Sequence, residues 1–184
     1  MGGKVMSDID ILHRMISEKA KILPSKRNTV TLTEAKEKNS IVEISGIPSN
    51  SIIIKIDQFP PSEHFFSCIK GECKRADYAI IAESGKRKRI LFIELKKTQD
   101  LEKEIILQFE GAECVMAYCK GVAESFYNAK DLLNDFKPRF VAFYHTSIRK
   151  RKTRIHRKAS KHNIPEKLLK IQWPKKMQYN QLVG

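Results

Sequence analysis

Residues 75–97 read RADYAIIAESGKRKRILFIELKK, and the rest of the chain is organised around this segment. Two runs within it, 78–82 and 90–95, consist largely of β-branched, aromatic and small residues, which are typical of strands. Gly85 lies between the runs and supplies the backbone freedom that a tight hairpin turn needs. Because the runs are apolar on both faces, we expect two central strands that are covered on both sides.

The turn also predicts how the two strands pair. If it is centred on Gly85 and Lys86, Asp77 lies opposite Glu94, and the Cβ atoms of opposed residues lie about 4.5–5.5 Å apart. Side chains alternate between the two faces of a strand, so Glu94 and Lys96 share one face. We therefore expect two carboxylates and an ammonium group to meet at one end of the hairpin, provided that no bulge shifts the register.

Two opposed acids on a sheet repel each other, and each raises the pKa of the other. A hard divalent cation between Asp77 and Glu94 would remove this conflict, because Mg²⁺ is bound through one or two carboxylates, waters and substrate phosphate. Lys96 could then orient or help to deprotonate the attacking water and offset phosphate charge. The pattern predicts a phosphodiesterase site, and a solvated strand end with ordinary charges is the alternative.

Asp77, followed after sixteen residues by Glu94-Leu95-Lys96, resembles the motif of the PD-(D/E)XK nuclease superfamily, which includes restriction endonucleases, Holliday-junction resolvases and RecB-type nucleases. Ala76 stands where proline is usual in that motif. The resemblance implies an α/β fold with a restriction-endonuclease-like αβββαβ core, in which helices flank a central mixed sheet. It also implies Mg²⁺- or Mn²⁺-dependent hydrolysis of nucleic acid. The metal ligands would be Asp77, Glu94 and the backbone carbonyl of Leu95, and Lys96 would position the nucleophile.

The same resemblance adds two candidate site residues. Members of the superfamily often carry an extra acid on the helix before the first core strand, and a helix predicted over 31–39 offers Glu34, although its capping-box position explains this residue equally well. Gln108 falls within the apolar stripe of a helix predicted over 98–120. RecB-type members carry a glutamine on this helix and a tyrosine four residues later, where this chain has Ala112. A core glutamine with a hydrogen-bond partner is the alternative.

Composition predicts a single domain over residues 1–184 that binds polyanions. The chain has 184 residues, of which 41% are hydrophobic, and 35 Lys and Arg against 21 Asp and Glu give a net charge of +14. Such an excess favours polyanions, with nucleic acid as the first candidate and an anionic membrane surface as the second. DNA is expected rather than RNA only because the resemblance to the superfamily implies it. There is no apolar run of about 18–20 residues and no signal-peptide core, so we expect a cytoplasmic protein that does not enter membranes.

Residues 147–163 form a basic run that we expect to be an arm inserted near the C-terminus. We expect it to be exposed, because it combines many cations with few apolar residues. An arm of this kind would grip phosphates, with steep salt dependence, and a solvated flexible segment is the alternative. The predicted nucleic-acid-binding residues are Arg149, Lys150, Arg151, Lys152, Arg154, Arg157, Lys158 and Lys161.

The four cysteines, Cys68, Cys73, Cys114 and Cys119, form two C-x4-C pairs. Some nucleases related to the superfamily carry iron–sulfur clusters, but Cys114 and Cys119 on a helix would lie about 140° apart, too far round to hold one ion. Reduced thiols are the expectation, because disulfides are rare in cytosolic proteins.

The remaining elements follow from hydrophobic periodicity and turn residues. Helices are predicted over 6–23, 31–39, 98–120 and 123–134. Further strands are predicted over 41–45, 52–57, 65–69, 139–145 and 167–173.

Two functions from different classes account for these features. The first is a metal-dependent nuclease with Asp77, Glu94 and Lys96 at its centre. The second is a non-catalytic nucleic-acid-binding or assembly subunit on the same fold, in which the acids are incidental. The sequence leaves open whether the chain forms a homodimer.

Overall fold

The computed structural model describes residues 6–33, 41–60, 63–96, 102–144, 162–172 and 176–184. These residues form a mixed α/β fold with a five-stranded sheet, in the order β3-β4-β5-β6-β7, and a three-stranded sheet, in the order β1-β2-β8. The strands are β1 (Val30–Thr33), β2 (Ile41–Ser45), β3 (Asn50–Lys55), β4 (Tyr78–Ser84), β5 (Arg87–Lys96), β6 (Lys137–Tyr144), β7 (Leu169–Gln172) and β8 (Lys176–Gln178). The helices are α1 (Asp8–Met15), α2 (Glu102–Tyr127) and α3 (Tyr179–Val183), with 3₁₀ turns η1 (Glu18–Ala20), η2 (Ile56–Gln58) and η3 (Pro165–Lys167).

The β4–β5 hairpin has the predicted register. Ser84 pairs with Arg87 and Tyr78 pairs with Ile93, so the turn is centred on Gly85 and Lys86. Gly85 has a φ of 56°, a left-handed conformation that glycine adopts without a steric penalty. The same alignment, continued by one residue, puts Asp77 opposite Glu94.

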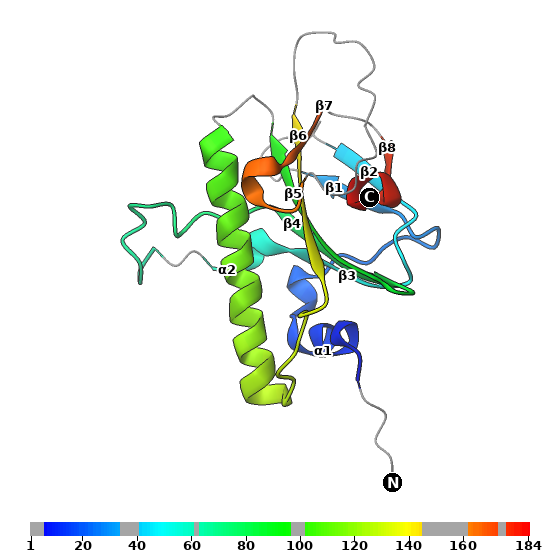
Figure 1. Cartoon of the computed structure of the whole chain (residues 1–184), viewed down its shortest axis with the longest axis horizontal. Helices are drawn as coiled ribbons and strands as arrows, with labels where there is room; N and C mark the ends of the chain where they lie inside the picture. Colours follow the sequence, from blue (N-terminus) through cyan, green and yellow to red (C-terminus); the bar gives the residue numbers. More distant parts are fainter. Residues whose placement is uncertain (1–5, 34–40, 61–62, 97–101, 145–161, 173–175) are drawn as a thin grey trace.

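The five-stranded sheet is mixed. Strands β3, β4 and β5 are antiparallel neighbours, whereas β6 runs parallel to β5, and β7 runs parallel to β6. Helix α2 makes the connection from β5 to β6 and lies along one side of the sheet (Figure 1). Two parallel strands need such a crossover, and here it places a long helix over the face that carries the candidate site.

Each face of this sheet has its own hydrophobic core. On the first face, Phe109 of α2 packs edge-on against Phe140, which stacks on Phe92 with 5.2 Å between ring centroids. On the second face, apolar side chains of the small sheet and of α3 cover strands β3 to β6. The strands at the centre are therefore covered on both sides, as their apolar sequences predicted.

The helix predicted over 6–23 is shorter in the structure. Ser7 caps its start as expected and accepts a hydrogen bond from the backbone N–H of Asp10, but α1 ends at Met15. Ser17 then accepts a hydrogen bond from the N–H of Lys19 and begins the 3₁₀ turn η1. Lys21 pairs with Ile54 of β3, so contact with the sheet and a local serine bond prevail over helical periodicity.

The prediction of a helix over 31–39 is wrong for its first residues, which belong to strand β1. Val30 and Leu32 are buried and alternate with exposed threonines, and β1 pairs antiparallel with β2. The alternation of β-branched residues, with period two, therefore outweighs the capping-box pattern. The rest of that prediction, including Glu34, lies outside the described residues.

Two further predictions of local structure are wrong. Residues 65–69 form turns and not a strand. The helices predicted over 98–120 and 123–134 are one helix within the described residues, because α2 continues through the exposed Gly121 to Tyr127. A single exposed glycine costs a helix about 1 kcal/mol, which tertiary packing can offset. Asn128, with a φ of 55°, ends the helix in the left-handed conformation.

Cys68 and Cys73 form a disulfide, so the expectation of reduced thiols is wrong for this pair. A tight turn brings their Cα atoms to 5.3 Å, a separation that suits a disulfide. Cys114 and Cys119 are free, and burial raises the pKa of the Cys119 thiol to about 11. Among the helices of the described residues, none combines the length and the apolarity that crossing a membrane would need.

Candidate active site

The predicted cluster forms at the end of the β4–β5 hairpin that lies away from the turn. Asp77 immediately precedes β4, and Glu94 and Lys96 are among the last residues of β5. Glu94 alternates with Leu95 and shares a face with Phe92, whose ring belongs to the core under α2. The site is therefore on the α2 side of the sheet.

Reciprocal hydrogen bonds hold the two acids at the ends of their strands. The backbone N–H of Asp77 donates to Oε2 of Glu94 at 3.1 Å, and the N–H of Leu95 donates to Oδ2 of Asp77 at 2.8 Å. Lys96 Nζ lies 3.0 Å from Oε1 of Glu94. Each carboxylate thus bonds the backbone of the neighbouring strand, and the lysine completes the cluster, as the hairpin register predicted.

Glu94 is buried with only 1% of its surface exposed. Burial, and after it the charge of Asp77, raise the pKa of Glu94 to about 8 against the opposing effect of Lys96. At neutral pH and without a cation, the proton is therefore favoured on this carboxyl group. A positive charge placed beside the two acids would favour the ionised form, which is the electrostatic character of a cation site.

The donor set fits a hard cation. Asp77 and Glu94 both supply carboxylate oxygens at this end of the hairpin, and the carbonyl of Leu95 stays a predicted ligand. Within the ranges that the structure describes, no group of three or more His, Cys, Asp and Glu side chains could hold a metal ion. Two carboxylates supplemented by water are the usual protein contribution to a Mg²⁺ site, whereas a zinc site more often uses Cys and His.

No family model, curated protein or solved structure matches this chain. The interpretation of the cluster therefore depends on its own geometry and chemistry.

Gln108 is on α2, the helix that covers the site face of the sheet. Its Oε1 atom is buried and has no hydrogen-bond partner among the described residues. Its neighbours Ile105 and Phe109 are fully buried against the sheet. The alternative was a core glutamine whose side-chain carbonyl has a hydrogen-bond partner, and the described residues provide no such partner. A role for Gln108 in the site stays a prediction.

Asp57 is a third carboxylate at the same end of the sheet, which the sequence interpretation missed. The N–H of Ile56 donates to the backbone carbonyl of Asp77 at 2.9 Å, which brings the end of β3 beside the site. Burial raises the pKa of Tyr78, and the charges of Asp77 and Asp57 add to this. Asp57 is paired with Lys55 at 3.4 Å. In the sequence, Asp57 follows an isoleucine-rich strand, and this position could have indicated that its carboxylate lies at the end of the sheet.

Arg75 is a second residue that the sequence interpretation missed, two positions before Asp77. Its Nη1 atom donates to the carbonyl of Pro60 at 3.1 Å, and its guanidinium group lies 5.8 Å from the centre of the Phe59 ring. Burial lowers the pKa of Arg75, and the charges of Asp57 and Glu63 oppose this. Arg75 therefore fixes a positive charge that Asp57 and Glu63 sense, two positions before Asp77.

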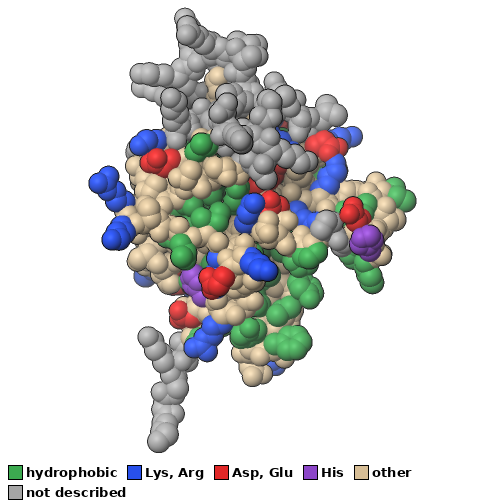
Figure 2. Space-filling model, turned by 180° about the vertical axis from the view of Figure 1, so that it is seen from behind, with side chains coloured by type: hydrophobic (Ala, Val, Ile, Leu, Met, Phe, Trp, Pro, Cys, Tyr) green, Lys and Arg blue, Asp and Glu red, His purple; other side chains and the backbone are tan. Residues whose placement is uncertain are grey.

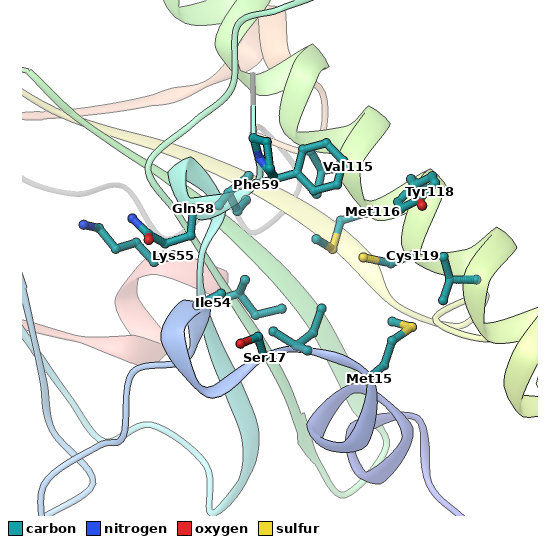
Figure 3. A pocket seen from close by; sticks show the side chains of 15 residues that line it. Met15, Ser17, Ile54, Lys55, Gln58, Phe59, Val115, Met116, Tyr118 and Cys119 are labelled. Atoms are coloured by element: carbon teal, nitrogen blue, oxygen red, sulfur yellow. The ribbon is translucent and has the colours of Figure 1, made fainter. Parts of the chain in front are cut away.

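An apolar cavity of about 340 Å³ lies between η1, the end of β3 and α2 (Figure 3). Met15, Ile54, Phe59 and Met116 are among its lining residues, together with the polar Ser17 and Gln58. None of the predicted site residues lines it. The candidate site is therefore the edge of the sheet at Asp77 and Glu94, and not this cavity.

The other predicted site residues lie outside the described residues. These are Glu34 and the whole set of predicted nucleic-acid-binding residues in 149–161.

Proposed function

We propose that this chain is a metal-dependent nuclease, which hydrolyses phosphodiester bonds in nucleic acid and prefers DNA to RNA. The observation that carries the proposal is the cluster of Asp77, Glu94 and Lys96. Its two carboxylates are hydrogen-bonded to each other's strands, and one of them is buried with a raised pKa beside a lysine.

We further propose that the five-stranded sheet is a restriction-endonuclease-like core. The elements α1, β3, β4, β5, α2 and β6 occur along the chain in the order αβββαβ. The strands β3 to β5 form an antiparallel meander, and α2 leads to the parallel strand β6. Strands β1, β2 and β8 would be an addition that covers the face opposite α2.

The proposed chemistry is hydrolysis by an attacking water. Asp77 and Glu94 would hold Mg²⁺ or Mn²⁺, and the ion would supply a more acidic bound water and a positive charge opposite the phosphate. Lys96 keeps 19% of its side chain exposed, so its ammonium group can reach solvent and position the water. Arg75 can neutralise phosphate charge on the side of β3.

The charge of the chain supports nucleic acid as the substrate. A net charge of +14 attracts polyanions, and the predicted basic residues 149–161 would extend this attraction. Charge alone would equally suit a non-catalytic binding or assembly subunit. A non-catalytic subunit, however, would gain nothing from the paired carboxylates of Asp77 and Glu94, because carboxylates repel the phosphate backbone of a bound nucleic acid.

The test is a cleavage assay with single-stranded, duplex and branched DNA and with RNA, in Mg²⁺ or Mn²⁺. We expect the parent to cut at least one substrate, and Glu94→Gln and Lys96→Ala to lose cutting by about 10²-fold or more while they keep binding. Glu83→Gln is the matched control, because Glu83 is at the turn end of the same hairpin and pairs with Lys88. Binding without cleavage of any substrate would favour the non-catalytic subunit.

A further inference from the structure

One loop carries an unusual concentration of exposed apolar side chains. The exposed fractions are 85% for Phe65, 48% for Phe66 and 84% for Ile69. Single exposed apolar residues are common on protein surfaces, but three within five positions require an explanation. We call residues 63–74 the Phe65 loop. It projects from the body beside α2 (Figure 1), and the projection carries both hydrophobic and charged side chains (Figure 2).

The Phe65 loop is held in one shape by its own bonds. The Cys68–Cys73 disulfide closes the turn. The carboxylate of Glu72 accepts hydrogen bonds from the N–H of Lys70 at 2.8 Å and from the hydroxyl of Ser67 at 3.2 Å. These bonds fix residues 67–73, which directly follow the two aromatic residues, and so reduce the conformational entropy that the loop loses on binding.

The loop is also anchored to α2 at the base. A Cβ atom on Gly111 would lie 1.7 Å from the carbonyl oxygen of Lys74, so the two backbones are in direct contact. Lys74 forms an ion pair with Glu104, and Gly71 lies against Leu107. The chain then continues through Arg75 to Asp77. The Phe65 loop is thus a fixed extension of the segment that positions the first acid of the candidate site.

We infer that the Phe65 loop binds nucleic acid by stacking Phe65 and Phe66 on unpaired bases next to the phosphate that enters the site. This inference rests on the proposed function, since the ligand is the substrate of that site. The two rings meet edge to face, with centroids 4.9 Å apart and an angle of 88°, and Phe65 stays almost fully exposed. Flat aromatic faces bind bases of any sequence by stacking.

The net charge of the chain, +14, favours a polyanion as the ligand of the loop over a protein or a lipid surface. Lys70 is exposed, and Arg75 follows on the stem after Lys74, whose charge is paired with Glu104. Of the two acids in the loop, Glu72 is engaged by the hydrogen bonds of the turn, and Glu63 lies in the field of Arg75. Exposed rings, with Lys70 on the loop and Arg75 between the loop and Asp77, match the base and phosphate parts of one strand.

The test measures binding without cleavage, in EDTA, with oligonucleotides that contain 2-aminopurine. We expect the parent to change the fluorescence of unpaired 2-aminopurine. Phe65→Ala with Phe66→Ala should bind single-stranded and branched DNA about tenfold more weakly, with little change for duplex DNA. The matched control is Phe126→Ala, because Phe126 is 79% exposed near the C-terminal end of α2. It should behave as the parent.

Phe65→Trp provides a second measurement that does not depend on a loss of binding. The stacking inference predicts that its fluorescence is quenched by single-stranded DNA and not by bovine serum albumin or by vesicles of phosphatidylcholine. Unchanged binding by the double variant, or no quenching, overturns the inference even if the parent cleaves DNA. Stacking by a parent that never cleaves would instead contradict the proposed function, and of this inference only the stacking of bases on the Phe65 loop would stand.

Discussion

Glu94 is the residue whose environment differs most from that of an ordinary carboxyl group. It is 1% exposed, accepts a hydrogen bond from the backbone of Asp77 and is paired with Lys96. Its raised pKa of about 8 has burial as the first cause. The folded chain therefore binds a proton on Glu94 at pH values where an unfolded chain has lost it.

This proton predicts how stability depends on pH in the absence of metal. Because the folded pKa is above the usual carboxyl value, the contribution of Glu94 is fully present at low pH and is lost as pH rises towards about 8. Glu94→Gln cannot ionise, so it should melt about 5 °C higher than the parent above pH 8 in EDTA, with a smaller difference near pH 5. Thermal unfolding of both proteins from pH 5 to 9 measures this. Parallel curves across that range would contradict the burial of the carboxyl group.

The central residues of the candidate site could be predicted because they depend on local geometry. A tight turn at Gly85 and the period of two along a strand suffice to bring Asp77, Glu94 and Lys96 together. Asp57 and Arg75 could not be found in this way, because their positions depend on how β3 pairs with β4 and on a ring contact with Phe59.

At the scale of elements, helix α2 holds the stem of the Phe65 loop through one close backbone contact. Gly111 leaves room for the carbonyl of Lys74, which a Cβ atom there would approach to 1.7 Å. Gly121, by contrast, has no atom within 4 Å of the position where its Cβ would be. The two glycines of one helix therefore make a matched pair for mutation.

Gly111→Ala should destabilise the fold by about 1–3 kcal/mol, because the stem must move away from the helix. Gly121→Ala should stabilise it by up to about 1 kcal/mol through helix propensity. Chemical denaturation of the three proteins measures both values. If Gly111→Ala were as stable as Gly121→Ala, the stem of the loop would not lie against α2.

The elements that sequence reasoning missed were decided by contacts between distant segments. Residues 30–33 form a strand because β2 offers a partner and the core under the small sheet accepts Val30 and Leu32. Helix α1 ends early because Lys21 pairs with Ile54 across the sheet edge. The long strands were predictable from their apolar runs, and the helical character of α2 from its periodicity, although the prediction divided this helix at Gly121.

At the scale of the whole molecule, the C-terminal segment closes the second core. The N–H of Phe140 donates to the carbonyl of His162, and Nε2 of His162 lies 2.8 Å from the carbonyl of Leu182 in α3. Arg139 Nε donates to the carbonyl of Val183 at 3.1 Å. These bonds tie β6 to the end of the chain, and the buried histidine makes the link sensitive to pH.

Burial lowers the pKa of His162, and the charge of Arg139 lowers it further, against the opposing effect of Leu182. The contribution of a neutral His162 is therefore present above the unfolded pKa and is lost as pH falls below it. We expect the free energy of unfolding to fall between pH 7 and 5, and His162→Gln to flatten that dependence at the cost of about 1–2 kcal/mol at pH 7. Urea titrations of both proteins across this range test it. If the free energy of unfolding of His162→Gln fell as steeply between pH 7 and 5 as that of the parent, His162 would not be the group responsible for the pH dependence.

Calorimetric titration with Mn²⁺ at a pH above 8, where Glu94 ionises, tests the central claim most directly. The account predicts saturable binding by the parent and by Glu83→Gln, with loss of that binding in Asp77→Asn and in Glu94→Gln. No binding by the parent, or equal binding by all four proteins, would contradict a cation site between the two strands.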